Sequence, residues 1–198
     1  MEHKLGNPTP WSSRARSLEK KWCTWGHRNF RYDVTETLQS IWRSRWRILD
    51  VGCGIGITYS HLPPKIQKCF MGVDFTPEFI AFCRSKYPKG AWELGDARNL
   101  RFPDDSFQIV TTTNVLQHIL EWKEAALELA RIASRYVVNT ERIHKGKTTV
   151  VSENPVLRRR FNPSDLIDFY SQYGSTRFRW VLNSGGNKTL GIFITELN

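Results

Sequence analysis

Residues 48–56 read ILDVGCGIG, a short apolar run with one acid, followed by glycine at alternate positions. An apolar run that stops at glycines is typical of a buried parallel strand followed by a turn. Glycine lets backbone approach a ligand closely, with N–H groups free to bind it. The stretch therefore predicts a ligand-binding turn, whose candidate contacts are Asp50, Gly52, Gly54 and Gly56.

The spacing of this turn separates it from two common nucleotide-binding motifs. The dinucleotide motif G-x-G-x-x-G requires a third glycine at the position that Ile57 occupies. The P-loop requires a Gly-Lys-Ser/Thr sequence, and none follows the turn. The turn is therefore a moderate signal by itself, and an NAD-dependent dehydrogenase remains an open alternative.

The rest of the chain predicts an α/β fold. Strand-like and helix-like segments alternate through residues 46–140, which favours right-handed crossovers and a parallel sheet covered on both faces. We expect strands at 46–51, 68–74, 91–96, 106–114 and 135–140, and helices at 77–87 and 120–133. A helix near 162–174 and an antiparallel hairpin over 175–197 complete the fold. Residues 1–45 look mostly helical.

Composition describes a protein of one domain with an uneven charge distribution. The 198 residues carry a formal net charge of +10, with no apolar stretch long enough to span a membrane and no secretory signal. The four cysteines form no C-x-x-C pair, so we expect a cytoplasmic protein with reduced thiols and no metal site. Residues 1–47 carry ten basic and four acidic residues, 141–163 carry six and two, and 48–140 carry ten of each. The positive excess therefore lies in two segments that flank a neutral block.

Two further acids end predicted strands on the same side as the glycine turn. Asp74 follows Gly54 by twenty residues, where a carboxylate can accept hydrogen bonds from both ribose hydroxyls of a nucleoside. Asp96 ends the third strand, where it can accept a hydrogen bond from an adenine amino group. Ligands of open α/β sheets bind at the carboxyl ends of strands, so these acids and the turn predict one nucleoside site.

At this point an ordered set of motifs identifies a family. ILDVGCGIG, VDFTPEFI, GDARNLRFPDDSFQIV and NVLQHI together resemble the class I S-adenosylmethionine-dependent methyltransferases, especially the small-molecule type, over residues 46–140. The resemblance implies a Rossmann-like seven-stranded sheet of order 3-2-1-4-5-7-6, with strand 7 antiparallel and helices on both faces. It also implies S-adenosyl-L-methionine as cofactor. We divide the chain into a helical N-terminal cap over the active site (1–45) and a methyltransferase domain (46–198), in which 141–163 is a basic lid insertion.

The resemblance assigns roles on the methionine side of the cofactor. Gly52, Gly54 and Gly56 look like the turn beneath the methionine moiety. Asp50 is similar to the acid that orients its amino group, and Asn114 resembles the position whose backbone meets that group.

On the nucleoside side, the resemblance involves two acids and their neighbours. Asp74 looks like the ribose-binding acid, with Phe75 packing near the adenine. Asp96 and the backbone of Ala97 look like the groups that hydrogen-bond the adenine. For each acid, a helix cap or a solvated loop is the alternative interpretation.

The acceptor side is less defined. His118 follows Asn114 by four residues, and we predict that it contacts the acceptor or acts as a base, with a polar pocket wall as the alternative. His27 is a weaker candidate of the same kind. Trp25 and Tyr32 are candidates for an aromatic wall, although apolar packing of the cap is the more common role of such residues.

The basic lid points to the charge of the acceptor. Arg158, Arg159 and Arg160 are anion-binding candidates, because guanidinium groups pair with carboxylates and phosphates. We therefore favour a methyltransferase acting on an O, N or C atom of an anionic small molecule. An RNA or protein methyltransferase that docks through the basic cap is one alternative, and a non-catalytic S-adenosylmethionine-binding protein is another. The sequence does not indicate the oligomeric state.

Overall fold

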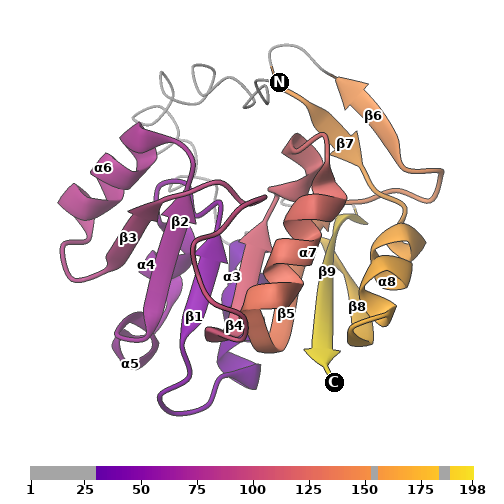
Figure 1. Cartoon of the computed structure of the whole chain (residues 1–198). Helices are drawn as coiled ribbons and strands as arrows, with labels where there is room; N and C mark the ends of the chain where they lie inside the picture. The colour runs from indigo at the N-terminus through magenta and orange to yellow at the C-terminus, as the bar shows by residue number, and fades with distance from the viewer. Residues whose placement is uncertain (1–29, 153–155, 183–187) are drawn as a thin grey trace.

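A computed structural model describes residues 30–152, 156–182 and 188–198, and it contains a seven-stranded sheet at its centre (Figure 1). The strand order is β3-β2-β1-β4-β5-β9-β8. The strands are β1 (Ile48–Val51), β2 (Phe70–Asp74), β3 (Ala91–Leu94), β4 (Phe107–Thr113), β5 (Ala133–Arg142), β8 (Gly174–Leu182) and β9 (Lys188–Leu197). Strand β9 runs antiparallel to β5 and to β8. The predicted fold class and strand order are confirmed, with β8 and β9 as the predicted strands 6 and 7.

The register of the sheet brings the ends of its parallel strands to one edge. Ile48 of β1 pairs in parallel with Phe70 of β2 and with Ile109 of β4. Strand β4 in turn pairs in parallel with β5. The segments that follow β1, β2, β4 and β5 therefore leave the sheet at the same edge, which is the edge where ligands of such sheets bind.

Helices cover both faces, as the sequence predicts. They are α3 (Phe30–Ile41), α4 (Ile57–His61), α5 (Pro64–Gln67), α6 (Pro77–Lys86), α7 (Trp122–Ile132) and α8 (Pro163–Ser171). Strand residues alternate between the faces, so Val137 packs with α7 and α8 while its neighbour Val138 packs with α3 to α6. The Asn162 side chain caps α8 by accepting a hydrogen bond from the Ser164 N–H at 3.0 Å.

Helix α3 packs against this sheet. Val34 and Leu38 are buried in the same apolar cluster as Ile48. Arg179 of β8 donates to the Asp33 carboxylate at 3.1 Å, which ties the helix to the far edge of the sheet. The predicted division into a cap (1–45) and a methyltransferase domain (46–198) stays a prediction, and α3 of that cap shares an apolar cluster with β1. Residues 1–29 of the predicted cap lie outside the described residues.

The predicted basic lid contains a small hairpin at the carboxyl edge of the sheet. Strands β6 (Thr149–Ser152) and β7 (Arg158–Arg160) pair antiparallel above α7 and α8 (Figure 1). A 3-10 turn, η1 (Leu116–His118), follows β4 and contacts β7. The lid segment therefore lies beside the segment that carries His118.

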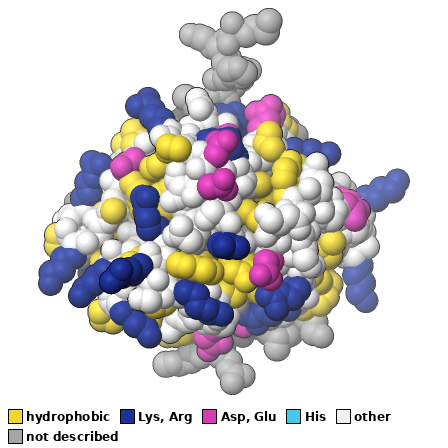
Figure 2. Space-filling model, turned by 60° about the horizontal axis from the view of Figure 1, so that its bottom comes forward, with side chains coloured by type: hydrophobic (Ala, Val, Ile, Leu, Met, Phe, Trp, Pro, Cys, Tyr) yellow, Lys and Arg dark blue, Asp and Glu magenta, His cyan; other side chains and the backbone are white. Residues whose placement is uncertain are grey.

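The opposite end of the molecule has a different surface. Figure 2 shows Lys and Arg side chains there scattered among apolar and uncharged ones, rather than gathered in one patch. Within the described ranges, no helix has the length and apolar character needed to cross a membrane.

Candidate functional site

The glycine turn after β1 has the backbone shape that its sequence predicts. Gly52, Gly54 and Gly56 have φ angles of 71°, 55° and 74°, a left-handed conformation that favours glycine. The Gly52 N–H donates to the Val73 carbonyl at 2.7 Å. A Cβ atom at Gly52 would lie 2.3 Å from a methyl carbon of Val115, so the turn packs tightly against the segment after β4.

Asp74 holds this turn from the end of β2. Its carboxylate is buried and accepts hydrogen bonds from the Gly54 and Thr76 N–H groups, both at 2.9 Å. Burial raises the pKa of Asp74, while these backbone hydrogen bonds oppose the shift. Thr76 is the N-cap residue of α6, and its side chain forms no cap hydrogen bond. A carboxylate has about four lone-pair sites, so two amides leave acceptor capacity for a ligand.

The predicted nucleoside contacts lie beside Asp74, and one of them has an unexpected partner. Phe75 is exposed at the end of β2. Asp96 pairs with Arg98, whose Nη2 lies 2.7 Å from Oδ2. Burial raises the pKa of Asp96, but the hydrogen bonds from the Arg98 side chain and backbone outweigh it, and the net pKa is lowered. Ala97 is half-buried against the core. Adenine recognition by Asp96 and Ala97 stays a prediction.

The segment after β4 begins with a residue of left-handed backbone and carries His118, which lies partly buried at the carboxyl ends of the strands. Asn114 has a φ of 58°, and its N–H donates to the Thr140 carbonyl at 2.7 Å. The Nδ1 atom of His118 lies 2.6 Å from the Leu157 carbonyl, which can only accept, so Nδ1 carries the proton. Nε2 then accepts from the Gln117 side-chain amide at 3.1 Å.

The electrostatic surroundings keep this imidazole neutral. Burial lowers the pKa of His118, and the charges of Arg158 and Arg142 lower it further, against the opposing hydrogen bond to Leu157. A neutral imidazole with a lone pair on Nε2 is the form that a base requires. Its contact with the acceptor stays a prediction.

A buried acid that the sequence analysis did not identify fixes this segment. Glu141, near the end of β5, is completely buried and accepts hydrogen bonds from three consecutive N–H groups. Those of Val115 and Leu116 approach Oε1 at 3.1 and 2.8 Å, and that of Gln117 approaches Oε2 at 3.2 Å. Burial raises the pKa of Glu141 to about 8, against the opposing effects of these amides and of Arg159. Glu141 therefore positions the turn that carries His118.

The three lid arginines separate into two kinds. Strand β7 alternates exposed, buried, exposed, so Arg159 points inward while Arg158 and Arg160 point outward. The Arg159 guanidinium donates to the carbonyls of Ile119 and Leu120 at 2.6 and 3.0 Å. Its donors bind backbone carbonyls just after η1, and its predicted contact with an anion stays a prediction. Arg158 and Arg160 stay candidates.

A fourth arginine joins the two exposed ones. Arg142 follows Glu141 at the end of β5, and its pKa is lowered by burial and by the positive charges of Arg158 and Arg160. Among the residues that the structure describes, no carboxylate forms an ion pair with any of the three. The charges of Arg142 and Arg158 thus act on His118, and that of Arg160 acts on Arg142, with no described carboxylate paired to any of the three.

The structure describes one of the two residues predicted to form an aromatic wall. Tyr32 of α3 is exposed and stacks edge-to-face on His61, with ring centroids 5.1 Å apart. Trp25 and His27 lie outside the described residues. Their predicted contact with the acceptor stays a prediction.

Comparisons with known proteins agree with this geometry. Residues 49–135 match the family model described as a methyltransferase domain. The Bacillus subtilis methyltransferase YcgJ is 36% identical over 95 residues, which cover 46% of this chain and 37% of that protein. Ajmaline N-methyltransferase from Rauvolfia serpentina is 29% identical over 93 residues, covering 44% and 32%.

A solved structure extends the likeness to nearly the whole fold. Burkholderia thailandensis 1,6-didemethyltoxoflavin-N1-methyltransferase, solved with 1,6-didemethyltoxoflavin and S-adenosylhomocysteine, has a TM-score of 0.79 at 11% identity. The match covers 98% of this chain and 88% of that one. Residues 49–135 therefore resemble a methyltransferase domain, and nearly the whole chain shares the fold of this solved methyltransferase. The two curated relatives are matched over about a third of their own lengths.

The residues at the carboxyl ends of the strands fit the predicted cofactor, S-adenosyl-L-methionine. The left-handed glycine turn allows close backbone approach, and Asp74 keeps acceptor capacity beside the exposed ring of Phe75. Asp50 supplies a second buried acid on β1. An amino group, two ribose hydroxyls and a flat base are the chemical groups that such an arrangement accommodates.

Sequence reasoning missed Glu141, Arg142 and the pairing of Arg98. Arg98 carried a usable signal, since an arginine two residues after a turn aspartate can fold back on it. Glu141 carried none, because its three partners lie 24 to 26 residues earlier in the chain. The strand period of two, applied to residues 158–160, would have separated Arg159 from its neighbours.

Proposed function

We propose that this protein is an S-adenosylmethionine-dependent methyltransferase that acts on an O, N or C atom of an anionic small molecule. The bound cofactor supplies an electrophilic methyl group, which passes to the acceptor as the bond to sulfur breaks. Such a displacement needs little covalent help from the protein. Holding the acceptor close to the methyl carbon can contribute about 7–11 kcal/mol toward the barrier.

The cofactor half of the proposal rests on the glycine turn and the strand-end acids. We expect Gly52, Gly54 and Gly56 to lie beneath the methionine moiety, with Asp50 and Asn114 near its amino group. On the nucleoside side, we expect Asp74 to bind the ribose, Phe75 to pack on the adenine, and Asp96 with Ala97 to read its edge.

His118 is the proposed contact to the acceptor. Its Nδ1 proton is held by the Leu157 carbonyl, so the ring can offer only Nε2 to an acceptor proton. The Gln117 amide occupies that lone pair and must move aside before the ring accepts a proton. The lowered pKa of His118 keeps the ring unprotonated at neutral pH. A base is needed only where the acceptor loses a proton on methylation.

The observation that carries the anionic acceptor is the cluster of Arg142, Arg158 and Arg160. The charges of Arg142 and Arg158 both act on His118, so the cluster is near the proposed acceptor contact. Because no described carboxylate pairs with these like charges, a bound anion is favoured, which reduces their mutual repulsion. Guanidinium groups also offer paired donors to carboxylates and phosphates.

Methyl-transfer kinetics test the proposal. A screen with radiolabelled S-adenosylmethionine identifies an acceptor, and the Arg158→Gln/Arg160→Gln double variant should then raise the acceptor KM about tenfold or more. The matched control is Arg135→Gln, an exposed arginine at the opposite end of β5. An unchanged acceptor KM in the double variant contradicts the anionic acceptor. Steep salt dependence of RNA binding would instead favour an RNA substrate.

A further inference from the structure

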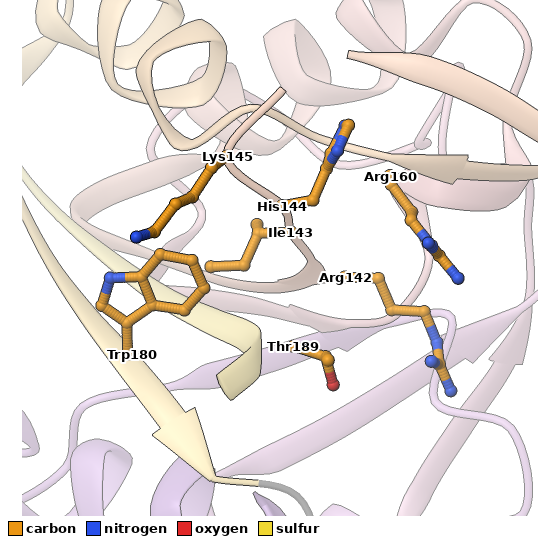
Figure 3. Close-up of a pocket in the computed structure, with 7 residues that line it drawn as sticks. All are labelled: Arg142, Ile143, His144, Lys145, Arg160, Trp180 and Thr189. Carbon is orange, nitrogen blue, oxygen red and sulfur yellow. The ribbon is translucent and has the colours of Figure 1, made fainter. Parts of the chain in front are cut away.

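A cavity opens beside the arginine cluster. It has a volume of about 490 Å³, and residues that line it come from the end of β5, from β7 and from the terminal hairpin (Figure 3). The contributions that matter chemically are Arg142, Ile143, Lys145, Arg160 and Trp180. We call this space the β5 cavity.

The walls of the β5 cavity differ in chemistry. Figure 3 shows Arg142 and Arg160 together on one side, and Trp180 with Lys145 on the other, with Ile143 between them. No Asp or Glu is among the described residues that line it. The cavity therefore combines three permanent positive charges with one large aromatic surface and an apolar floor.

The indole ring of Trp180 packs against a second aromatic ring. Trp180 is half-buried, and Phe178 contacts it edge-to-face with ring centroids 5.6 Å apart and an interplanar angle of 69°. This arrangement is a favourable one for aromatic pairs and fixes the indole plane. A fixed indole beside cations suits a ligand with a flat ring, because stacking then costs little conformational freedom.

We propose that the β5 cavity binds a flat ring that carries a phosphate monoester, with the phosphate on Arg142 and Arg160 and the ring against Trp180. The ligand would be the methyl acceptor itself, so this inference rests on the proposed function and names its substrate class. The cavity volume exceeds that of a phosphate group alone and falls in the range of small-molecule sites.

The number of cations selects a phosphate over a carboxylate. A single arginine satisfies a carboxylate with its paired donors. Here the two guanidiniums of Arg142 and Arg160 lie on one side of the cavity, and the positive charges of Arg158 and Arg160 lower the pKa of Arg142. A phosphate monoester carries between one and two negative charges near neutral pH and three acceptor oxygens, so it matches this excess more closely.

Calorimetric binding of simple probes tests the inference without requiring turnover. The probes are 1-naphthyl phosphate, 1-naphthoate and inorganic phosphate, each titrated into the full chain with S-adenosylhomocysteine present. We expect 1-naphthyl phosphate to bind at least tenfold more tightly than either of the others. Equal or tighter binding of 1-naphthoate, or no binding of 1-naphthyl phosphate, would overturn the proposal.

Two variants assign the contacts. Arg142→Gln/Arg160→Gln should weaken 1-naphthyl phosphate binding at least tenfold, whereas the control Arg135→Gln should leave it unchanged. Trp180→Leu should weaken 1-naphthyl phosphate severalfold while leaving inorganic phosphate unaffected. Trp180→Phe, which keeps a flat ring, should restore most of the affinity. Wild-type affinity in the double arginine variant would contradict the inference.

The same titrations separate this inference from the proposed function. Retained S-adenosylhomocysteine binding shows that a variant is folded. Probe binding without any methyl transfer would refute the proposed activity and leave the β5 cavity assignment standing. Methyl transfer to an acceptor that neither competes with 1-naphthyl phosphate nor depends on Arg142 and Arg160 would refute the cavity assignment alone.

Discussion

Asp74 and Glu141 are two buried acids that stabilise two neighbouring segments in the same way. Each lies near the carboxyl end of a strand, and each accepts hydrogen bonds from backbone N–H groups. Asp74 holds the turn that we assign to the cofactor, and Glu141 holds the turn that carries His118. The site is thus built from two similar supports, one on the donor side and one on the acceptor side.

The two acids differ in the number of hydrogen bonds that oppose the effect of burial on their pKa. Asp74 accepts from two amides, and Glu141 accepts from three while the charge of Arg159 acts on it. Even so, complete burial raises the pKa of Glu141 to about 8. A support that ionises near neutral pH makes the acceptor side sensitive to conditions, and the following predictions test that contrast.

The largest expected effect is on the donor side. Asp74→Asn removes a charge and one of the acceptor oxygens, so an amide of the glycine turn and a ribose hydroxyl lose their partners. We expect S-adenosylhomocysteine affinity to fall about 100-fold, from hydrogen bonds to a charged group of about 1.5–3 kcal/mol each. Isothermal titration calorimetry measures it. Affinity within threefold of wild type would remove Asp74 from the cofactor site.

The next largest effect tests the contact between the glycine turn and the segment that carries His118. Gly52→Ala adds a Cβ atom 2.3 Å from Val115 at a residue with φ of 71°, and we expect a loss of about 2–3 kcal/mol in unfolding free energy. Urea denaturation measures the loss. Adding Val115→Ala should recover part of it by removing the clash. If the double variant is no more stable than Gly52→Ala, the two segments are not packed as described.

A smaller effect tests the titration of Glu141. Its pKa is about 8 in the folded state and near 4.5 in the unfolded chain, so the folded state holds an extra proton between these values. Stability contributed by this group is therefore complete below about pH 4.5 and is lost as pH rises toward 8, with a slope of at most about 1.4 kcal/mol per pH unit. Glu141→Gln should remove that part of the slope in urea denaturation between pH 5 and 8.

The control for this prediction is a distant acid. Glu93→Gln changes an exposed residue on β3 and should keep the wild-type slope. Glu141→Gln should also keep its S-adenosylhomocysteine affinity, because Asp74 supports that side. Parallel pH profiles for wild type and Glu141→Gln would show that Glu141 does not titrate in this range.

The smallest effect separates the two kinds of lid arginine. Arg158→Gln should raise the acceptor KM a few fold with little change in melting temperature, because Arg158 is exposed. Arg159→Gln should lower the melting temperature by several degrees, because the Ile119 and Leu120 carbonyls lose a charged donor. Thermal unfolding and initial-rate kinetics on both variants measure the two effects. The reverse pattern would contradict the assignment.

The difference between local contacts and contacts far apart in the sequence explains what the sequence could predict. The strand segments and the glycine turn follow from patterns within short segments, whereas the strand order followed from the family resemblance; the order was confirmed, and the turn has the left-handed backbone that favours glycine. The support at Asp74 is local too, since its partners are the turn and the residue two positions on. Glu141 and Arg159 act on a turn far away in sequence, and only tertiary packing reveals their partners.

The most direct test of the account compares each anionic acceptor with its uncharged ester in radiolabelled methyl transfer. Wild-type protein should label the anion at least tenfold faster at equal, subsaturating concentration. The Arg142→Gln/Arg158→Gln/Arg160→Gln variant should lose that preference while binding S-adenosylhomocysteine normally. Equal labelling of anion and ester by wild type, or no labelling of any acceptor by a protein that binds the cofactor, would contradict the account.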